Sequence, residues 1–273
     1  MRRAALLCCL LAGCAAQPPR GGGIVSTNPC ADAMLVELVP PERIAAISHY
    51  SRDPATSSIP LETARRFRAT RGTAEEVVAM RPELVIASSF TSSATREAYA
   101  RAGLKALYLD SPVTIQASQA QVTELASALG AAEAGAAMNA RIDRAMTAAG
   151  WRGAQLPALV WVGGNLVSGG GNLLDEMITR AGFSNHAAHY GLRFTGYLPI
   201  EHVVMDPPRV MLVPDAPGRA ASSRAAQMRS RALAHLDARV EQVHFSRTLV
   251  NCGGPVIARA MTRLAEVRRS LGS

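Results

Sequence analysis

Only a few residues of this 273-residue chain are of types that perform covalent or metal chemistry, chiefly five Cys and six His. Cys30 follows Asn28 and Pro29, which suit the start of a helix. A helix start lowers the pKa of a thiol, so Cys30 with a distant His could act as a nucleophile. A Cys-dependent enzyme is therefore one open interpretation.

The other candidate motifs are weaker. His186 and His189 are three residues apart, with Asp175 and Glu176 nearby, and such a set could bind bare zinc or manganese. The glycine-rich residues 163–171 lack the Lys-Ser/Thr of a P-loop and open no dinucleotide-binding fingerprint. The chain also has no Gly-x-Ser-x-Gly motif. We expect no catalytic residue, no resident cofactor and no metal ligands, with the two interpretations above as alternatives.

Composition narrows the class of protein. Hydrophobic residues make up 48% of the chain and aromatic residues only 4%, so we expect a core of Ala, Leu and Val. The formal charge is +8, and Lys105 is the single Lys among 29 basic residues. The Arg residues are scattered, and no zinc-finger or aromatic-basic RNA motif occurs, which argues against a nucleic-acid binder.

The sequence of the N-terminus predicts that the protein is exported. Residues 1–3 are positively charged, and the apolar residues 4–12 have the length of a signal-peptide core, too short to span a bilayer. They end in Leu11-Ala12-Gly13-Cys14, which resembles a bacterial lipobox and implies removal of residues 1–13 and lipidation of Cys14. An ordinary signal cut after Ala16 is the alternative. We expect a periplasmic lipoprotein, tethered to a membrane through residues 14–23 by lipid alone.

Export also determines which cysteines remain in the folded part of the protein. Cys8 and Cys9 leave with the signal, and Cys30 and Cys252 remain in the folded body. In an oxidising compartment this pair suggests a disulfide, but two separate thiols are equally consistent with the sequence, and metal ligation is a third possibility. Loss of Arg2 and Arg3 lowers the formal charge from +8 to +6.

Strand and helix signals alternate along the body, which predicts an α/β fold with parallel sheets. Residues 114–149 nearly lack Pro and Gly and predict one long helix or two joined ones, a rigid connector. We therefore expect two lobes, at 24–113 and 151–273, with a connecting helix at 114–150. The expected strands are 23–27, 44–48, 84–87, 105–109, 158–162 and 209–213, with short extended pieces at 242–245 and 248–250. The expected helices are 31–38, 74–81, 96–102, 173–181, 200–205, 220–234 and 255–271, the last with Arg259, Arg263, Arg268 and Arg269 exposed.

A repeated unit supports two similar lobes. Glu75 opens an apolar helix that ends at Pro82 before a strand, and Thr73 with Glu76 predicts a capping box there. Glu201 opens the same pattern before Pro208. Each Glu stands seven residues before its Pro, and a repeat is stronger evidence than either copy alone.

In this order, behind an export signal, these features resemble the substrate-binding proteins of ABC importers for iron–siderophore, haem and cobalamin. The resemblance covers about residues 24–270, through the segments 24–29, 72–87, 172–177 and 198–201 and the central helix. It implies two Rossmann-like lobes joined by a long rigid helix, with a ligand cleft between them. It also implies a metal chelate as ligand, an inner-membrane permease with its ATPase as partner, and a monomer.

The resemblance further implies site residues. In this family an acidic residue on each lobe docks onto an Arg pocket of the permease, and the matching positions are Glu75 and Glu201. A carboxylate near a helix N-terminus is well placed for a bidentate pair with Arg. Simple capping of the two helices is the alternative.

The ligand is expected at loops that follow strand C-termini. Residues 48–54 resemble a cleft loop of cobalamin binders, where a Tyr lies against the corrin, and Tyr50 matches it. Those proteins place a Trp where this chain has Ser88, with Phe90 two residues on, so the corrinoid pattern is incomplete. The full set of expected ligand contacts is His49, Tyr50, Arg52, Ser88, Phe90, Trp161, Arg193 and Tyr197. Arg52 and Arg193, with Arg219, would neutralise an anionic chelate, and Trp161 would either reach the cleft or close the core of the second lobe.

Overall fold

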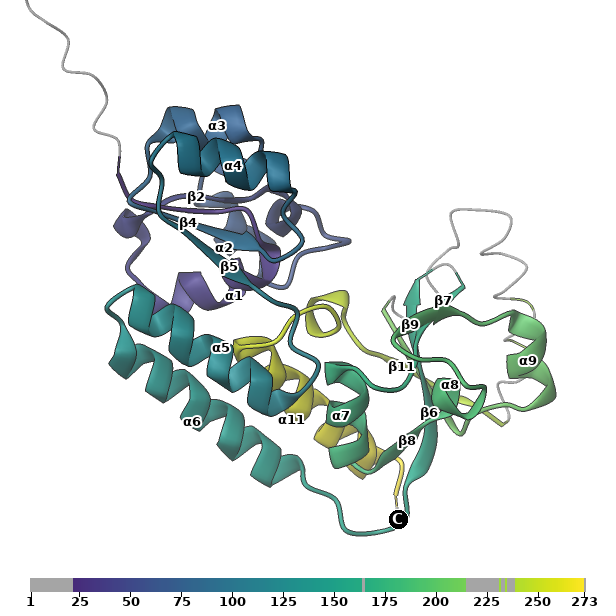
Figure 1. Ribbon diagram of the computed structural model, residues 1–273. Coiled ribbons are helices and arrows are strands. Elements are labelled where there is room, and N and C mark those ends of the chain that lie inside the picture. Colours follow the sequence, from purple (N-terminus) through teal and green to yellow (C-terminus); the bar gives the residue numbers. More distant parts are fainter. Residues whose placement is uncertain (1–21, 164, 215–230, 232–233, 235–238, 273) are drawn as a thin grey trace, which may run out of the picture.

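The computed structural model describes residues 22–163, 165–214, 231, 234 and 239–272 (Figure 1). Cys14, the signal, most of the tether, Arg219 and most of the helix expected at 220–234 lie outside these residues. No helix in the described ranges is long and apolar enough to cross a bilayer. Figure 1 shows two α/β lobes standing side by side on a layer of helices.

The first lobe is a five-stranded parallel sheet in the order β3-β2-β1-β4-β5. The expected strands and helices are present, and the two-residue strand β3 is too short to leave a sequence signal. The strands are β1 (Ile24–Ser26), β2 (Ile44–Ser48), β3 (Ala69–Thr70), β4 (Leu84–Ser88) and β5 (Ala106–Leu109). The helices are α1 (Pro29–Leu38), α2 (Leu61–Arg65), α3 (Ala74–Met80) and α4 (Ser93–Arg101), with short 3-10 turns at Pro41–Arg43 and His49–Arg52.

The second lobe has a mixed sheet in the order β11-β10-β6-β7-β9, with β8 beside the start of β6. Its strands are β6 (Leu156–Gly163), β7 (Leu166–Ser168), β8 (Phe183–Asn185), β9 (Thr195–Tyr197), β10 (Val210–Val213) and β11 (Glu241–His244). Its helices are α7 (Leu173–Arg180), α8 (His186–His189), α9 (Ile200–Met205) and α11 (Pro255–Ser270). The antiparallel ribbon of β7 and β9 was not expected, and the predicted extended piece at 248–250 is instead a 3-10 turn at Arg247–Leu249.

The connector is two helices rather than one. α5 (Ile115–Ala128) and α6 (Ala132–Ala149) are separated by Gly130, whose φ of +66° reverses the chain so that the helices pack against each other. Val122 and Leu125 of α5 join the apolar core of the first lobe, while Ile142 and Ala149 of α6 join that of the second. α5, α6 and α11 thus form a platform under both lobes (Figure 1).

Local capping explains several helix starts. The Asn28 side chain accepts the backbone N–H groups of Cys30 and Ala31, and Thr73 accepts that of Glu76. The expected capping box is only half formed, because Glu76 turns away from Thr73. Its Oε2 accepts hydrogen bonds from the Thr70 hydroxyl at 2.6 Å and the Arg71 N–H at 2.8 Å, and these hold the pKa of Glu76 below its usual value. Glu76 of α3 therefore connects this helix to β3 through hydrogen bonds.

Candidate functional site

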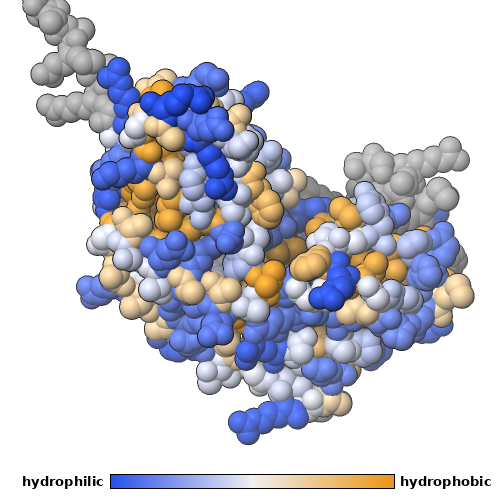
Figure 2. Space-filling model, in the orientation of Figure 1, coloured by the Kyte–Doolittle hydropathy of each residue, from blue (hydrophilic) through white to orange (hydrophobic). Residues whose placement is uncertain are grey.

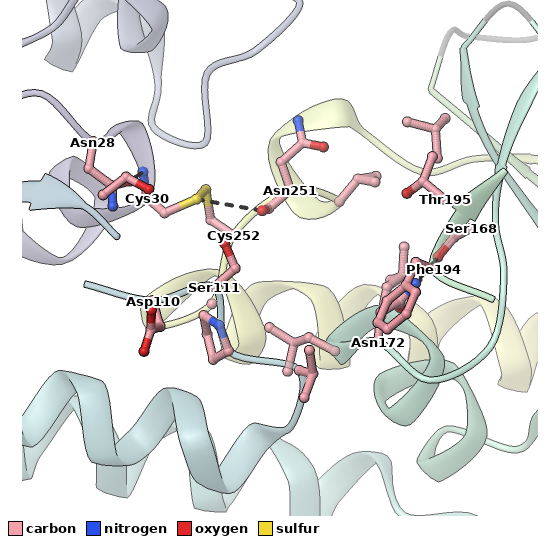
Figure 3. A pocket seen from close by; sticks show the side chains of 18 residues that line it. Asn28, Cys30, Asp110, Ser111, Ser168, Asn172, Phe194, Thr195, Asn251 and Cys252 are labelled. Atoms are coloured by element: carbon pink, nitrogen blue, oxygen red, sulfur yellow. Dashed lines mark hydrogen bonds between the residues drawn. A yellow bond between two sulfur atoms is a disulfide. The ribbon is translucent and has the colours of Figure 1, made fainter. Parts of the chain in front are cut away.

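A cavity of about 340 Å³ lies between the two lobes, a volume typical of small-molecule sites. Figure 2 shows the notch between the lobes from outside, and Figure 3 shows the side chains that line it. The first lobe contributes Asn28, Cys30, Ser88 and residues 110–113. The second lobe contributes Val162, Ser168, Asn172, Leu173, Leu174, Phe194, Thr195 and residues 250–253.

Strand C-termini make the wall on the first lobe. Asn28 comes just after β1, Ser88 ends β4, and Asp110 follows β5. The parallel register pairs Ser88 with Leu109, so these positions meet at one edge of the sheet. The carboxyl edge of a parallel sheet is where ligands bind in open α/β folds, which is the placement expected from the sequence.

The antiparallel ribbon makes the opposite wall. Ser168 of β7 pairs with Thr195 of β9, and both line the cavity. Phe194 has a φ of +58°, held by its N–H bond of 2.8 Å to the Gly170 carbonyl. Only Gly fits at position 169, because a Cβ there would lie 2.4 Å from the Leu192 carbonyl oxygen. The ribbon thereby presents an aromatic ring and two hydroxyl groups to the cavity.

Four helices begin at the cavity: α1, α5, α7 and α11. Their first N–H groups are partly capped by protein groups, including a 2.7 Å bond from Ile115 N–H to the Glu176 carboxylate and a 2.9 Å bond from Asp175 N–H to the Asn172 side chain. Among the described lining residues there is no Lys, Arg or His, and Asp110 is the one charged side chain. The N-terminal ends of these four helices contribute positive potential to the site.

A disulfide joins the two lobes, and both of its cysteines line the cavity (Figure 3). Cys30 lies in the first turn of α1 and Cys252 lies just before α11, with an S–S distance of 2.08 Å and a Cα–Cα distance of 5.1 Å. Of the alternatives open in the sequence, the structure has the disulfide. It leaves Cys30 without the free thiol that a Cys-dependent enzyme would need.

One of the expected ligand residues lines the cavity, and three others are exposed outside its lining. Ser88 lines the cavity. Tyr50, Phe90 and Tyr197, here called the cleft aromatics, do not line it but are 49%, 81% and 74% exposed. Tyr50 and Phe90 follow the C-terminal ends of β2 and β4, and Tyr197 is two residues along β9 from Thr195, on the same strand face. All three are therefore exposed and lie outside the described lining of the cavity.

The remaining four expected ligand residues, His49, Arg52, Trp161 and Arg193, are not among the described residues that line the cavity. Trp161 is 5% exposed and packs in the core of the second lobe with Val203 and Met211, so it does not line the cavity. The guanidinium of Arg52 donates to the carbonyl oxygens of Phe67 and, at 3.4 Å, Ala64.

Arg52 is thus held by its own lobe, where it satisfies carbonyl groups instead of facing a ligand. His49 is half-buried, with Nδ1 3.3 Å from the Thr70 carbonyl oxygen and its ring tilted by 36° against that of Tyr50, at a centroid distance of 4.0 Å. Arg193 is exposed beside Gly170 and Gly171.

The expected docking residues occupy equivalent places. Glu75 lies in the first turn of α3 and Glu201 in the first turn of α9, and both are exposed. Within the described residues neither forms an ion pair, in contrast to Glu76, which is bound to Thr70 and Arg71. Each lobe therefore has an exposed carboxylate in the first turn of a helix.

The structure separates the residues of the suggested zinc or manganese site. Asp175 accepts bonds from Gly171 N–H and Asn185, and Glu176 accepts bonds from Ile115 N–H and Arg180. His186 and His189 instead face Asp206, at 3.6 and 3.4 Å from its Oδ2. Across the described ranges no three His, Cys, Asp or Glu side chains are placed to hold a metal ion.

Several lining residues were not expected from the sequence. Residues 110–113 follow the strand at 105–109 and could have been found by the rule that ligands meet strand C-termini. Asn172 could have been found as a helix N-cap after a glycine run. Val162 and Val250 carry no such signal, because only the meeting of the lobes brings them to the cavity.

Two α/β lobes on a helical platform, with a ligand-sized cavity between them, define a two-lobed binding protein. A family model described as periplasmic binding protein matches residues 24–242, so the chain belongs to the periplasmic binding protein family. Among curated protein sequences, none matches it.

Solved structures share the fold. The periplasmic haem-binding protein RhuT from Roseiflexus sp. RS-1, in apo form, is 22% identical with a TM-score of 0.74, over 93% of this chain and 100% of that one. A periplasmic haem-binding protein from Pseudomonas aeruginosa is 19% identical with a TM-score of 0.68, over 90% and 91%. The periplasmic vitamin B12 binding protein BtuF of Vibrio cholerae is 16% identical with a TM-score of 0.64, over 91% and 98%.

Proposed function

We propose that this protein is the substrate-binding component of an ABC importer, which captures a metal chelate in the periplasm and delivers it to the inner-membrane permease and its ATPase. The observation that carries the proposal is the cavity between two lobes, each with an exposed Glu in the first turn of a helix, Glu75 in α3 and Glu201 in α9. Structural relatives whose names state haem or vitamin B12 binding support the ligand class.

The described lining residues suit a metal chelate with polar groups at its periphery. Among them there is no His, Tyr or Met, and the exposed Tyr50 and Tyr197 lie outside this lining. It offers Asn, Ser and Thr side chains together with the positive ends of four helix dipoles, which suit peripheral amide, hydroxyl or carboxylate groups. Ferric siderophores, cobalamin and haem all carry such groups, so all three are candidate ligands of the proposed site.

The ligand is expected to extend beyond the cavity. A volume of about 340 Å³ is at the small end of ligand pockets, and these chelates are larger. The cleft aromatics would cover the protruding face of a flat or catechol-rich ligand, since aromatic rings bury large areas with little loss of side-chain freedom. Binding and a small closure of the lobes, rather than bond chemistry, are the proposed mechanism.

We also propose that a lipid anchor holds the protein at the membrane. A lipid on Cys14 and a tether ending at residue 23 would keep the protein near the membrane that holds the permease. Glu75 and Glu201 would then pair with Arg residues of the permease, one for each lobe.

Isothermal titration of the purified protein with ferric siderophores, cyanocobalamin and haemin tests the ligand class. We expect binding of at least one chelate, with loss on Thr195→Trp, which fills the cavity, and no loss on Thr179→Trp, on the exposed side of α7. Absence of binding to every chelate in these classes, together with no co-purified chromophore, would refute the proposal.

A further inference from the structure

The first lobe meets the rest of the molecule along α1. Within the described residues, its chain continues to the platform only through residues 110–114, which run from β5 to α5. The Cys30–Cys252 disulfide crosses the same boundary a second time, between residues 222 positions apart in the sequence. Both of its cysteines line the cavity.

We propose that this disulfide and the Cys252-Gly253-Gly254 segment position the two walls of the ligand cavity, acting as a second junction that sets the spacing of the lobes where the cysteines line the cavity. The inference deepens the proposed function and, for its effect on affinity, rests on it.

The segment around Cys252 is built into both lobes. Cys252 and Val256 belong to the apolar core of the first lobe, with Met34 and Val122, whereas Ile257 belongs to the core of the second. The chain thus passes from one core to the other within a few residues. A shift between the lobes at this level would have to break one of two close-packed interiors.

Two glycines allow this close approach. A Cβ on Gly253 would lie 2.3 Å from the Ser118 hydroxyl oxygen, and one on Gly254 would lie 2.6 Å from Cγ of Met34. Gly254 also has a φ of +59° and donates its N–H to Ser118 Oγ at 2.8 Å. The segment is therefore held between α1 and α5 with no free space.

Three polar contacts hold the first lobe to the platform away from the disulfide. Glu37 of α1 pairs with Arg141 of α6, and Arg259 of α11 donates to the Ser58 carbonyl oxygen at 2.7 Å. Arg43 donates to the carbonyl oxygen of Leu129, at the end of α5, at 2.7 Å. With the disulfide, these contacts attach the first lobe to the platform at several points. Cavity walls held at a set spacing before binding reduce the ordering cost of binding.

Hydrogen exchange of the purified protein tests the junction without any ligand. In the Cys30→Ala/Cys252→Ala variant we expect exchange in α1 and in residues 250–256 to rise about tenfold, while β4 and β10 stay protected. Reduction of the wild-type protein under native conditions should give the same change, and reoxidation should reverse it. Unchanged exchange in these segments after complete reduction would overturn the proposal.

Affinity provides the second readout. For the chelate that the wild-type protein binds, we expect the double variant to bind about tenfold more weakly, mainly through faster release. Ser118→Ala keeps the disulfide and should have a smaller effect of the same kind. Unchanged affinity in a fully reduced protein would refute the positioning role, whereas a wild-type protein that binds no chelate would refute the proposed ligand class and leave the exchange result standing. If the double variant does not fold, hydrogen exchange and ligand affinity of the reduced wild-type protein and of Ser118→Ala test the proposal.

Discussion

The carboxylate of Asp32 accepts a 2.6 Å hydrogen bond from the hydroxyl of Ser51, joining the first turn of α1 to the turn that displays Tyr50. Its Oδ2 also accepts the Ser48 N–H at 2.9 Å, whereas Oδ1 has no partner. Asp32 is fully buried. Loss of hydration on burial exceeds the effect of these bonds and raises the pKa of Asp32 from 3.8 to about 7.

This raised pKa predicts a loss of stability with increasing pH. Between pH 4 and pH 7 the folded protein holds a proton on Asp32 that the unfolded chain has released, so the free energy of unfolding falls across this range and levels off above it. The shift corresponds to about 4 kcal/mol for this group at most. In Asp32→Asn this part of the slope should vanish, as measured by urea unfolding at several pH values. Parallel slopes for the two proteins would contradict the assignment.

The docking proposal predicts a separation of transport from binding. Glu75→Gln combined with Glu201→Gln should lower uptake at least tenfold, because each change removes one charge-assisted pair with the permease. Ligand affinity should stay unchanged, since neither residue lines the cavity. Uptake is measured in cells or proteoliposomes that contain the permease. Glu62→Gln with Glu241→Gln, also exposed and of equal charge change, is the matched control and should leave uptake intact.

Trp161 and Tyr197 should respond in opposite ways to replacement by Ala. Trp161 is 5% exposed, so its loss leaves a cavity in the core and should lower the free energy of unfolding by about 3 to 5 kcal/mol. Tyr197 is 74% exposed, so its loss should change stability by no more than about 0.5 kcal/mol and weaken ligand binding instead. Denaturant unfolding and calorimetric titration of both variants decide this. If Trp161→Ala kept its stability but lost ligand affinity, Trp161 would instead be a ligand-binding residue.

The disulfide should also stabilise the fold. It closes a loop over a sequence separation of 222, and its removal should lower the free energy of unfolding by about 2 to 5 kcal/mol through the larger entropy of the unfolded chain. Thermal unfolding of the wild-type protein with and without a reductant measures the effect. Equal unfolding midpoints after verified reduction would show that the junction is not a major source of stability.

Much of the fold was accessible from local patterns. The apolar runs at 44–48 and 84–87 are strands, and Thr73 and Asn28 cap helices as expected. The strands β3, β7, β8 and β9 were missed because two or three residues carry no usable periodicity. Glu75 and Glu201 emerged from a repeat, and the structure shows that both are exposed at the same place on their helices.

The sequence by itself determined the order of elements, the two-lobed plan and the loops expected to face a ligand, because these depend on residues close together along the chain. Tertiary structure decided which distant residues meet: Cys30 with Cys252, Asp110 with Asn172 in one cavity, and Arg52 with the Phe67 carbonyl. It also buried Arg268, expected at the surface, at 2% exposure against the ring of Trp151, 3.8 Å from the ring centroid. These outcomes depend on how two lobes close against a shared platform. Hydrophobic periodicity and capping act over a few residues, whereas that closure is set by packing across the whole chain.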